Sequence, residues 1–166
     1  MIEPNYEYYM RQALFEARAA FADEEVPVGC VIVDAVGNVI GRGRNCVARK
    51  RNSLYHAEVI AIHEACEKIG DWRLSEATMF VTIEPCPMCA GSIVMARVGT
   101  VVYGAPNKKA GCAGSILNVL NEPRFNHRVN VVGGVLAQEC GELMTEFFRK
   151  FLNRRPEGPL GKNEHC

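Results

Sequence analysis

Two short motifs contain the residue types that hold zinc and move protons. Residues 56–58 read His-Ala-Glu and residues 85–89 read Pro-Cys-Pro-Met-Cys, each at the start of a predicted helix. One imidazole and two thiolates, from His56, Cys86 and Cys89, make a three-ligand zinc site whose fourth tetrahedral position is left for water. An open position is typical of a catalytic zinc, so the pair of motifs predicts a catalytic metal centre.

A Cys-x-x-Cys pair by itself does not identify a site, because it also occurs as a redox pair or by coincidence. Adding the His-x-Glu motif favours the metal. A closed structural zinc site is the alternative, with His63 and Cys66 as the nearest candidates for a fourth ligand. His63 lies about two helical turns beyond His56, too far along the helix to share its metal easily.

The elements that must position these residues follow from hydrophobic periodicity and turn residues. The 28–43 segment reads as a β-hairpin, and the strand, helix, strand succession after residue 77 implies parallel pairing. The sum is an α/β fold with a mixed sheet of about five strands flanked by helices. We predict helices over 6–21, 56–68, 87–97, 117–120 and 137–152, and strands over 28–33, 39–43, 78–83, 100–103 and 129–132.

Length and composition indicate one globular domain. The 166 residues carry 19 basic and 19 acidic side chains, which argues against a general nucleic-acid coat protein but permits a local basic patch. We expect one domain over 1–155 and a flexible tail over 156–166. No apolar stretch predicts a membrane span or an export signal, and eight scattered cysteines fit a reducing cytoplasm, so we expect a cytoplasmic protein.

The chain resembles the cytidine deaminase superfamily and, within it, the bacterial tRNA adenosine deaminases, over almost its whole length to about residue 155. The stretches that carry the resemblance are 26–29, 56–62, 81–91, 114–115, 125–128 and 134–136 leading to 147–149. The resemblance implies a three-layer α/β/α fold, a homodimer and one Zn²⁺ per subunit. It also implies conversion of the wobble adenosine of a tRNA anticodon stem-loop to inosine.

The resemblance gives Glu58 the catalytic role. Zinc lowers the pKa of its bound water from about 15.7 to roughly 7, which yields a usable nucleophile at neutral pH. Glu58 would take a proton from this water, deliver it to a ring nitrogen and assist the departure of ammonia. Its position two residues beyond His56 places it near the metal without making it a ligand.

Four positions match the family's pocket for the flipped base. Asn45 matches a base-recognising asparagine, whose amide can donate and accept hydrogen bonds at a purine edge. Ala57 would contribute its backbone N–H, and Pro27 and Val28 would wall the base. Without the resemblance, the same residues fit an asparagine that closes a strand and an ordinary strand entrance.

Aromatic and basic residues near the end of the last predicted helix resemble positions that contact nucleotides beside the target. Consecutive helical residues point in different directions, so one phenylalanine of Phe147 and Phe148 is expected in the core. We predict RNA contacts for Phe148 and Arg149. The basic segments 49–51 and 108–109 fit either phosphate contacts or a solvated surface.

The sequence departs from its relatives at two places. Residues 52–55, Asn-Ser-Leu-Tyr, replace an aspartate, proline, threonine segment, so the pocket rim differs. Asn107 stands where many members carry aspartate, near the ribose and backbone of the target nucleotide. Loss of the carboxylate removes a repulsion toward phosphate, which predicts weaker discrimination between RNA and DNA.

Two other functions fit the motifs. A small-molecule deaminase acting on guanine, cytosine or a nucleoside would use the same zinc and Glu58, and only the 125–128 segment and the last helix favour the tRNA branch. A zinc-stabilised RNA-binding module without catalysis is the second alternative. Glu58 argues against it, because a structural zinc site needs no proton carrier.

Overall fold

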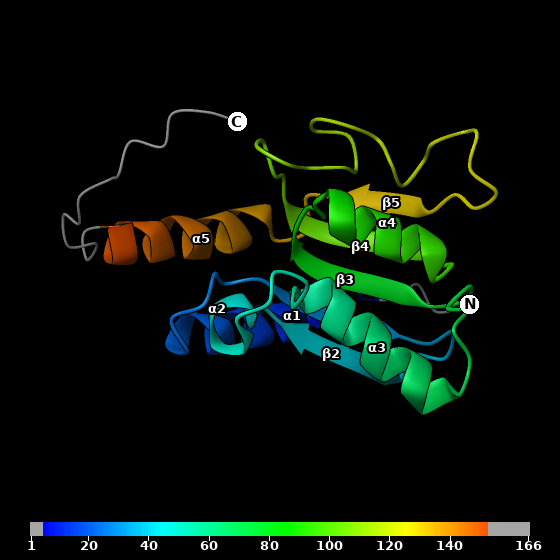
Figure 1. Cartoon of the computed structure of the whole chain (residues 1–166), viewed down its shortest axis with the longest axis horizontal. Helices are drawn as coiled ribbons and strands as arrows, with labels where there is room; N and C mark the ends of the chain where they lie inside the picture. Colours follow the sequence, from blue (N-terminus) through cyan, green and yellow to red (C-terminus); the bar gives the residue numbers. More distant parts are fainter. Residues whose placement is uncertain (1–4, 153–166) are drawn as a thin grey trace.

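The protein is a five-stranded mixed sheet with helices on both faces (Figure 1). The structure is a computed structural model that describes residues 5–152. Its elements are α1 (Tyr6–Ala22), β1 (Gly29–Val33), β2 (Val39–Arg44), α2 (Val47–Lys50), α3 (Ala57–Ile69), β3 (Thr78–Ile83), α4 (Pro87–Met95), β4 (Thr100–Ala105), β5 (Asn130–Gly133) and α5 (Ala137–Leu152). The strand order is β2-β1-β3-β4-β5.

Both kinds of strand pairing predicted from the sequence are present. Strand β1 pairs antiparallel with β2 and β3, which confirms the hairpin. Strands β3, β4 and β5 run parallel, and α4 forms the crossover between β3 and β4. The carboxyl end of β3 therefore leads directly into the helix that carries both cysteines of the predicted metal site.

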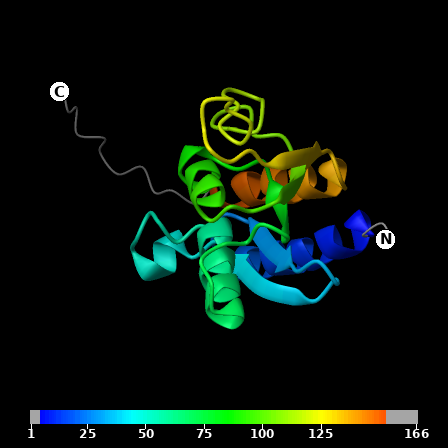
Figure 2. The same ribbon diagram turned by 90° about the vertical axis from the view of Figure 1, so that its right-hand side faces the viewer.

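Two separate apolar cores divide the molecule into three layers (Figures 1 and 2). Helices α1 and α5 cover one face, where Met10, Phe80 and Val102 are buried. Helices α3 and α4 cover the other, where Ala61, Met79 and Ile93 are buried. This arrangement confirms the predicted three-layer α/β/α fold, with His56 and both cysteines on the α3 and α4 side.

Helix α3 lies unusually close to strand β2 because the strand carries glycine at the contact. A Cβ atom added at Gly43 would lie 2.0 Å from the carbonyl oxygen of Ala57, and one added at Gly41 would lie 2.2 Å from that of Ala61. Any side chain at these positions would push α3 away from the sheet. The glycines thus allow the start of α3, which follows His56, to pack close against the sheet.

Some predicted elements differ from the structure. The helix predicted over 117–120 is wrong, because this segment is irregular and contains a single bridge residue, Asn118, which pairs with Ala113. Helix α2 was not predicted, and β4 continues two residues beyond residue 103. The predicted tail over 156–166 lies outside the described residues.

Smaller differences concern element ends. Helix α4 stops at Met95, short of the predicted residue 97, and Arg97 turns the chain with a φ of +59°. Strand β5 covers 130–133 instead of 129–132. Within residues 5–152, the structure contains no helix with the length and apolar character that crossing a membrane requires.

Candidate active site

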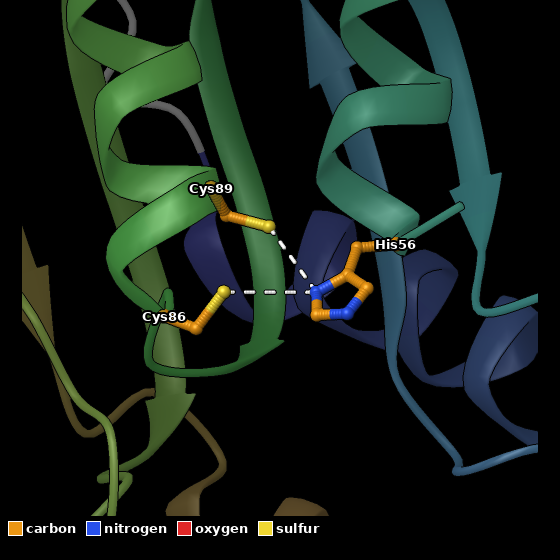
Figure 3. Close-up of side chains that lie close together, drawn as sticks. All are labelled: His56, Cys86 and Cys89. Carbon is orange, nitrogen blue, oxygen red and sulfur yellow. Dashed lines mark hydrogen bonds between the residues drawn. The ribbon is translucent and has the colours of Figure 1, made fainter. Parts of the chain in front are cut away.

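The three predicted zinc ligands converge from two helix starts (Figure 3). His56 is the N-cap residue of α3, Cys86 is the N-cap residue of α4, and Cys89 lies in the first turn of α4. Pro87 occupies the first helical position of α4, where its missing N–H and fixed φ suit a helix start. The sequence therefore delivers all three side chains to one point.

The distances among these side chains fit a single metal ion. The Nδ1 atom of His56 lies 3.6 Å from the Sγ atom of Cys86 and 3.4 Å from the Sγ atom of Cys89. Tetrahedral zinc with ordinary Zn–N and Zn–S bonds holds nitrogen and sulfur roughly 3.5 Å apart. All three ligand atoms lie within 4.8 Å of one another. The donor set and its spacing thus match zinc with one open position.

The two thiols behave as a pair that is prepared for a cation. Hydrogen bonds from Cys89 and then from His56 lower the pKa of Cys86 to about 4, despite its partial burial. The hydrogen bond to Cys86, together with burial, raises the pKa of Cys89 well above its ordinary value. The lowered pKa of Cys86 favours its thiolate, the form of cysteine that binds a metal cation.

Glu58 lies in the first turn of α3 and is almost fully buried, with 4% of its surface exposed. Burial raises its pKa above the ordinary glutamate value. A carboxyl group with a raised pKa can both accept and release a proton near neutral pH. The structure thus places next to His56 a group with the properties of a general acid and base.

These residues open into a cavity of about 980 Å³ between the sheet edge and α5. Its polar lining includes Asn45, His56, Glu58, Cys86 and Asn107. Of the other predicted site residues, Ala57, Val28 and Phe148 also line it. Such a volume admits a nucleoside-sized group with room at the mouth.

Apart from the fully buried Cys89, two predicted site residues do not line the cavity. Pro27 is buried, and its neighbours Val26 and Val28 line the cavity at this point. Pro27 is the central residue of a tight turn in which the N–H of Val28 donates to the carbonyl oxygen of Val26 at 2.8 Å. Arg149 is exposed on α5 but also lies outside the lining.

Phe147 and Phe148 divide as the helix geometry predicts. Phe147 is buried and packs edge-on against Phe21 at 5.6 Å between ring centroids. Phe148 is 44% exposed and lines the cavity. Of these two phenylalanines, it is therefore Phe148 that can present an aromatic face to a ligand.

Asn107 closes the turn that carries two lysines into the cavity wall. Its Oδ1 atom accepts hydrogen bonds from the backbone N–H groups of Lys109 and Ala110 at 3.2 and 3.0 Å. Lys108 and Lys109 both line the cavity, whereas the basic segment 49–51 does not. The phosphate contacts considered from the sequence are thus compatible with 108–109 at the cavity mouth.

The alternative fourth ligands lie elsewhere. His63 is exposed and pairs with Glu67 at 3.6 Å, and the thiol of Cys66 donates to the carbonyl oxygen of Trp72. Among residues 5–152, neither joins a group of three or more metal-binding side chains. The closed structural site is therefore not supported.

Sequence reasoning missed the buried carboxylate of Glu84, which holds one wall of the cavity. It accepts hydrogen bonds from the backbone N–H groups of Asn107, Ala113 and Ser115 at 2.9 to 3.0 Å, and from the hydroxyl group of Ser115. Burial alone raises its pKa, but these hydrogen bonds outweigh burial and lower it. The available signal was a charged residue at the end of an otherwise apolar strand.

Comparison with known proteins gives consistent matches. The family model of the MafB19-like deaminases matches residues 4–151. The tRNA-specific adenosine deaminase of Bacillus subtilis (strain 168) is 47% identical over 149 residues, which cover 90% of this chain and 92% of the relative. The chloroplastic tRNA(adenine(34)) deaminase of Arabidopsis thaliana is 42% identical over 159 residues, covering 86% of this chain and 12% of that protein.

A solved structure from a study of A-to-I editing by tRNA:A34 deaminases at the wobble position of transfer RNA has the same architecture. It superposes with a TM-score of 0.78 and 38% sequence identity, over 82% of this chain and 98% of the other. The shared fold includes the sheet and helices that carry the cavity.

Proposed function

The chain belongs to the tRNA-specific adenosine deaminase family, and we propose that it works with one zinc ion held by His56, Cys86 and Cys89. It is an enzyme that deaminates adenosine to inosine in tRNA, and the target is the wobble adenosine of the anticodon. The spacing of the three ligand atoms, which matches a tetrahedral metal site, supports zinc as the cofactor.

Glu58 moves the protons of the reaction. A zinc ion held by His56, Cys86 and Cys89 would lower the pKa of water to about 7 and so would supply a nucleophile at neutral pH. The Glu58 carboxylate takes a proton from the attacking water and passes it to N1 of the adenine ring. It then transfers the second water proton to the amino group at C6, which leaves as ammonia while the C6 carbonyl of inosine forms. Burial raises the pKa of Glu58, which favours its accepting and then releasing a proton.

The cavity wall recognises the flipped base. Asn45, 7% exposed, offers an amide to the purine edge, and Val28 packs against the ring. The N–H of Ala57 is among the first four of α3, which have no partner within the helix and so are free for the substrate. Asn107 lies at the mouth, where the ribose and its phosphates leave the cavity.

Residues around the cavity mouth bind the anticodon loop. Phe148 presents its ring for stacking with an unpaired nucleotide, and Lys108 and Lys109 meet phosphate groups. Arg149, exposed on the same helix outside the lining, contacts nucleotides that flank the target. The proposed substrate is thus the anticodon stem-loop. We place the reaction in the cytoplasm, where tRNA is used in translation.

We also propose a homodimer that uses the exposed side of α4. Of the small residues on α4, Ala90 is buried within the subunit, as is Ala96 just after the helix, which leaves Gly91 and Ser92 for a partner. A Cβ atom at Gly91 would meet no atom within 4 Å, and Met95 beside it is 74% exposed. An open helix face with small residues and an exposed methionine favours close packing of a second subunit.

The observation that carries the proposal is the buried Glu58 carboxyl group beside three converging metal ligands in an open cavity. The test is deamination of a minimal anticodon stem-loop with an unpaired wobble adenosine, assayed beside free adenosine, cytidine and guanine at one enzyme concentration. We expect inosine in the stem-loop and little turnover of the free compounds. Turnover of a free compound with none on the RNA would assign the site to small-molecule deamination.

A further inference from the structure

Glu25 is a buried carboxylate whose function the sequence does not reveal. It follows two other acidic residues, Asp23 and Glu24, in the segment between α1 and β1, and such a run usually forms a solvated surface. Only 2% of Glu25 is exposed, however. Glutamate is rarely this buried unless its oxygens have partners.

The partners of Glu25 come from the chain that follows β2. One carboxylate oxygen, Oε1, accepts the backbone N–H of Arg49 at 2.6 Å. The other, Oε2, accepts the backbone N–H of Ala48 at 3.1 Å and the side-chain Nδ2 group of Asn45 at 3.3 Å. The guanidinium group of Arg49 pairs with Asp23 instead, at 2.6 Å.

The first two contacts cap α2 from outside the helix. Ala48 and Arg49 are its second and third residues, and the N-cap residue Cys46 makes no side-chain hydrogen bond to them. Glu25 therefore satisfies N–H groups that a capping side chain would otherwise serve. This explains its burial but not its contact with Asn45.

The contact with Asn45 fixes which end of the amide faces the cavity. A carboxylate only accepts hydrogen bonds, so the amide nitrogen of Asn45, and not its carbonyl oxygen, must face Glu25. The carbonyl oxygen and the second amide hydrogen are then left for a bound base. An asparagine without such a neighbour could present either end, because the two differ little in shape.

We infer that Glu25 is a positioning residue that holds Asn45 in the one orientation able to recognise the target base. The inference rests on the proposed role of Asn45 in base recognition. Glu25 itself does not line the cavity and touches no substrate. It acts through a single side-chain hydrogen bond, so its effect on turnover must depend on the presence of Asn45.

A double-mutant cycle tests this dependence. Glu25→Gln, Asn45→Ala and the double variant are compared with the natural enzyme, using kcat/KM on the anticodon stem-loop, after zinc content confirms that each is folded and loaded. Glutamine at position 25 has one accepting oxygen instead of two, so it cannot accept from Asn45, Ala48 and Arg49 together, and we expect kcat/KM to fall roughly tenfold, the effect of one lost hydrogen bond. In the Asn45→Ala background, the same substitution should change kcat/KM by less than about twofold.

The cycle separates orientation of Asn45 from support of α2. Equal losses in both backgrounds would overturn the inference, because they would place the whole effect in the helix cap. An Asn45→Ala variant with normal kcat/KM would instead overturn the role of Asn45 itself, while deamination by the natural enzyme would leave the assigned reaction intact. Glu24→Gln, the same change at the exposed neighbouring residue, is the matched control and should stay within about twofold.

A measurement of stability covers the case in which Glu25→Gln does not fold. Asn45→Asp sets two carboxylates side by side and should lower Tm. Adding Glu25→Gln lets the glutamine amide donate to Asp at position 45, which reverses the hydrogen bond and should restore most of the lost Tm. No recovery in the double variant would show that the side chains at 25 and 45 are not coupled and would contradict the inference.

Discussion

The Nδ1 atom of His56 lies 3.4 Å from the Sγ atom of Cys89, although 33 residues separate them in the chain. The contact exists because α3 and α4 start at the same end of the sheet and lie on the same face. The starts of these two helices supply all three side chains, so no further helix or strand is needed to place them. The convergence of the three side chains therefore depends on the α/β/α architecture as much as on the two motifs.

The ligand set predicts which thiol the metal requires. Cys86→Ala removes one of three ligands, so the purified protein should lose its zinc and its activity. Cys66→Ala is the matched control, because Cys66 is a partly exposed thiol outside the ligand group. Metal analysis of both variants should give no zinc for the first and one zinc per subunit for the second. Full zinc in Cys86→Ala would contradict the assigned ligand set.

Replacing either of two adjacent phenylalanines with alanine should affect a different property: catalysis for Phe148 and stability for Phe147. Phe148→Ala should lower kcat/KM on the stem-loop roughly tenfold through lost stacking, with little change in Tm. Phe147→Ala opens a cavity among the rings of Phe21 and Phe151 and should cost about 3–5 kcal/mol of unfolding free energy. Denaturant unfolding and stem-loop kinetics distinguish the two. If Phe148→Ala lowered Tm but left kcat/KM on the stem-loop unchanged, the proposed RNA contact of Phe148 would be contradicted.

Removing the negative charge of the buried Glu84 should lower the stability of the protein. Glu84→Gln replaces one accepting oxygen with a donor that faces backbone N–H groups. The cost should be about 2 kcal/mol, which lowers Tm by roughly 4–8 °C in a domain of this size. Scanning calorimetry checks this, with the exposed Glu146→Gln as the control. An unchanged Tm would mean that the 107–115 loop does not depend on Glu84.

Asn107 predicts how the enzyme distinguishes RNA from DNA. Asn107→Asp keeps the Oδ1 acceptor for Lys109 and Ala110, so the turn should remain folded. The new carboxylate repels phosphate in both substrates but can accept a hydrogen bond from a 2′-hydroxyl only in RNA. The RNA-to-DNA ratio of kcat/KM should rise by roughly tenfold, about one hydrogen bond. Equal ratios for the two proteins would reject the role of Asn107 in sugar discrimination.

The grouping of His56, Cys86 and Cys89 and the mixed sheet flanked by helices could be predicted because both depend on local signals, whereas the three-layer arrangement was implied by the resemblance. His56 and Cys86 stand at helix starts that periodicity marks, and the ligand types themselves specify the metal chemistry. Likewise, the separation of Phe147 from Phe148 needed only the geometry of one helix. These features require no knowledge of distant contacts.

Other features depend on contacts that no local pattern records. A helix was predicted over 117–120, yet the segment is irregular, and just before it the backbone N–H groups of Ala113 and Ser115 donate to Glu84. Glu25 looked like part of an acidic surface, since its partners follow β2 about 20 residues away. Pro27 was assigned to the pocket by resemblance, whereas in the structure it is the buried centre of a turn whose neighbours Val26 and Val28 line the cavity.

The most direct test of the central claim is the turnover of zinc-loaded Glu58→Gln on the anticodon stem-loop. The substitution keeps the size of the side chain but removes its ability to carry protons. Zinc content should stay at one per subunit, while kcat should fall at least about 100-fold. Glu67→Gln, on the exposed side of the same helix, should react normally. Normal turnover by Glu58→Gln would contradict the account, because another group would then have to move the protons.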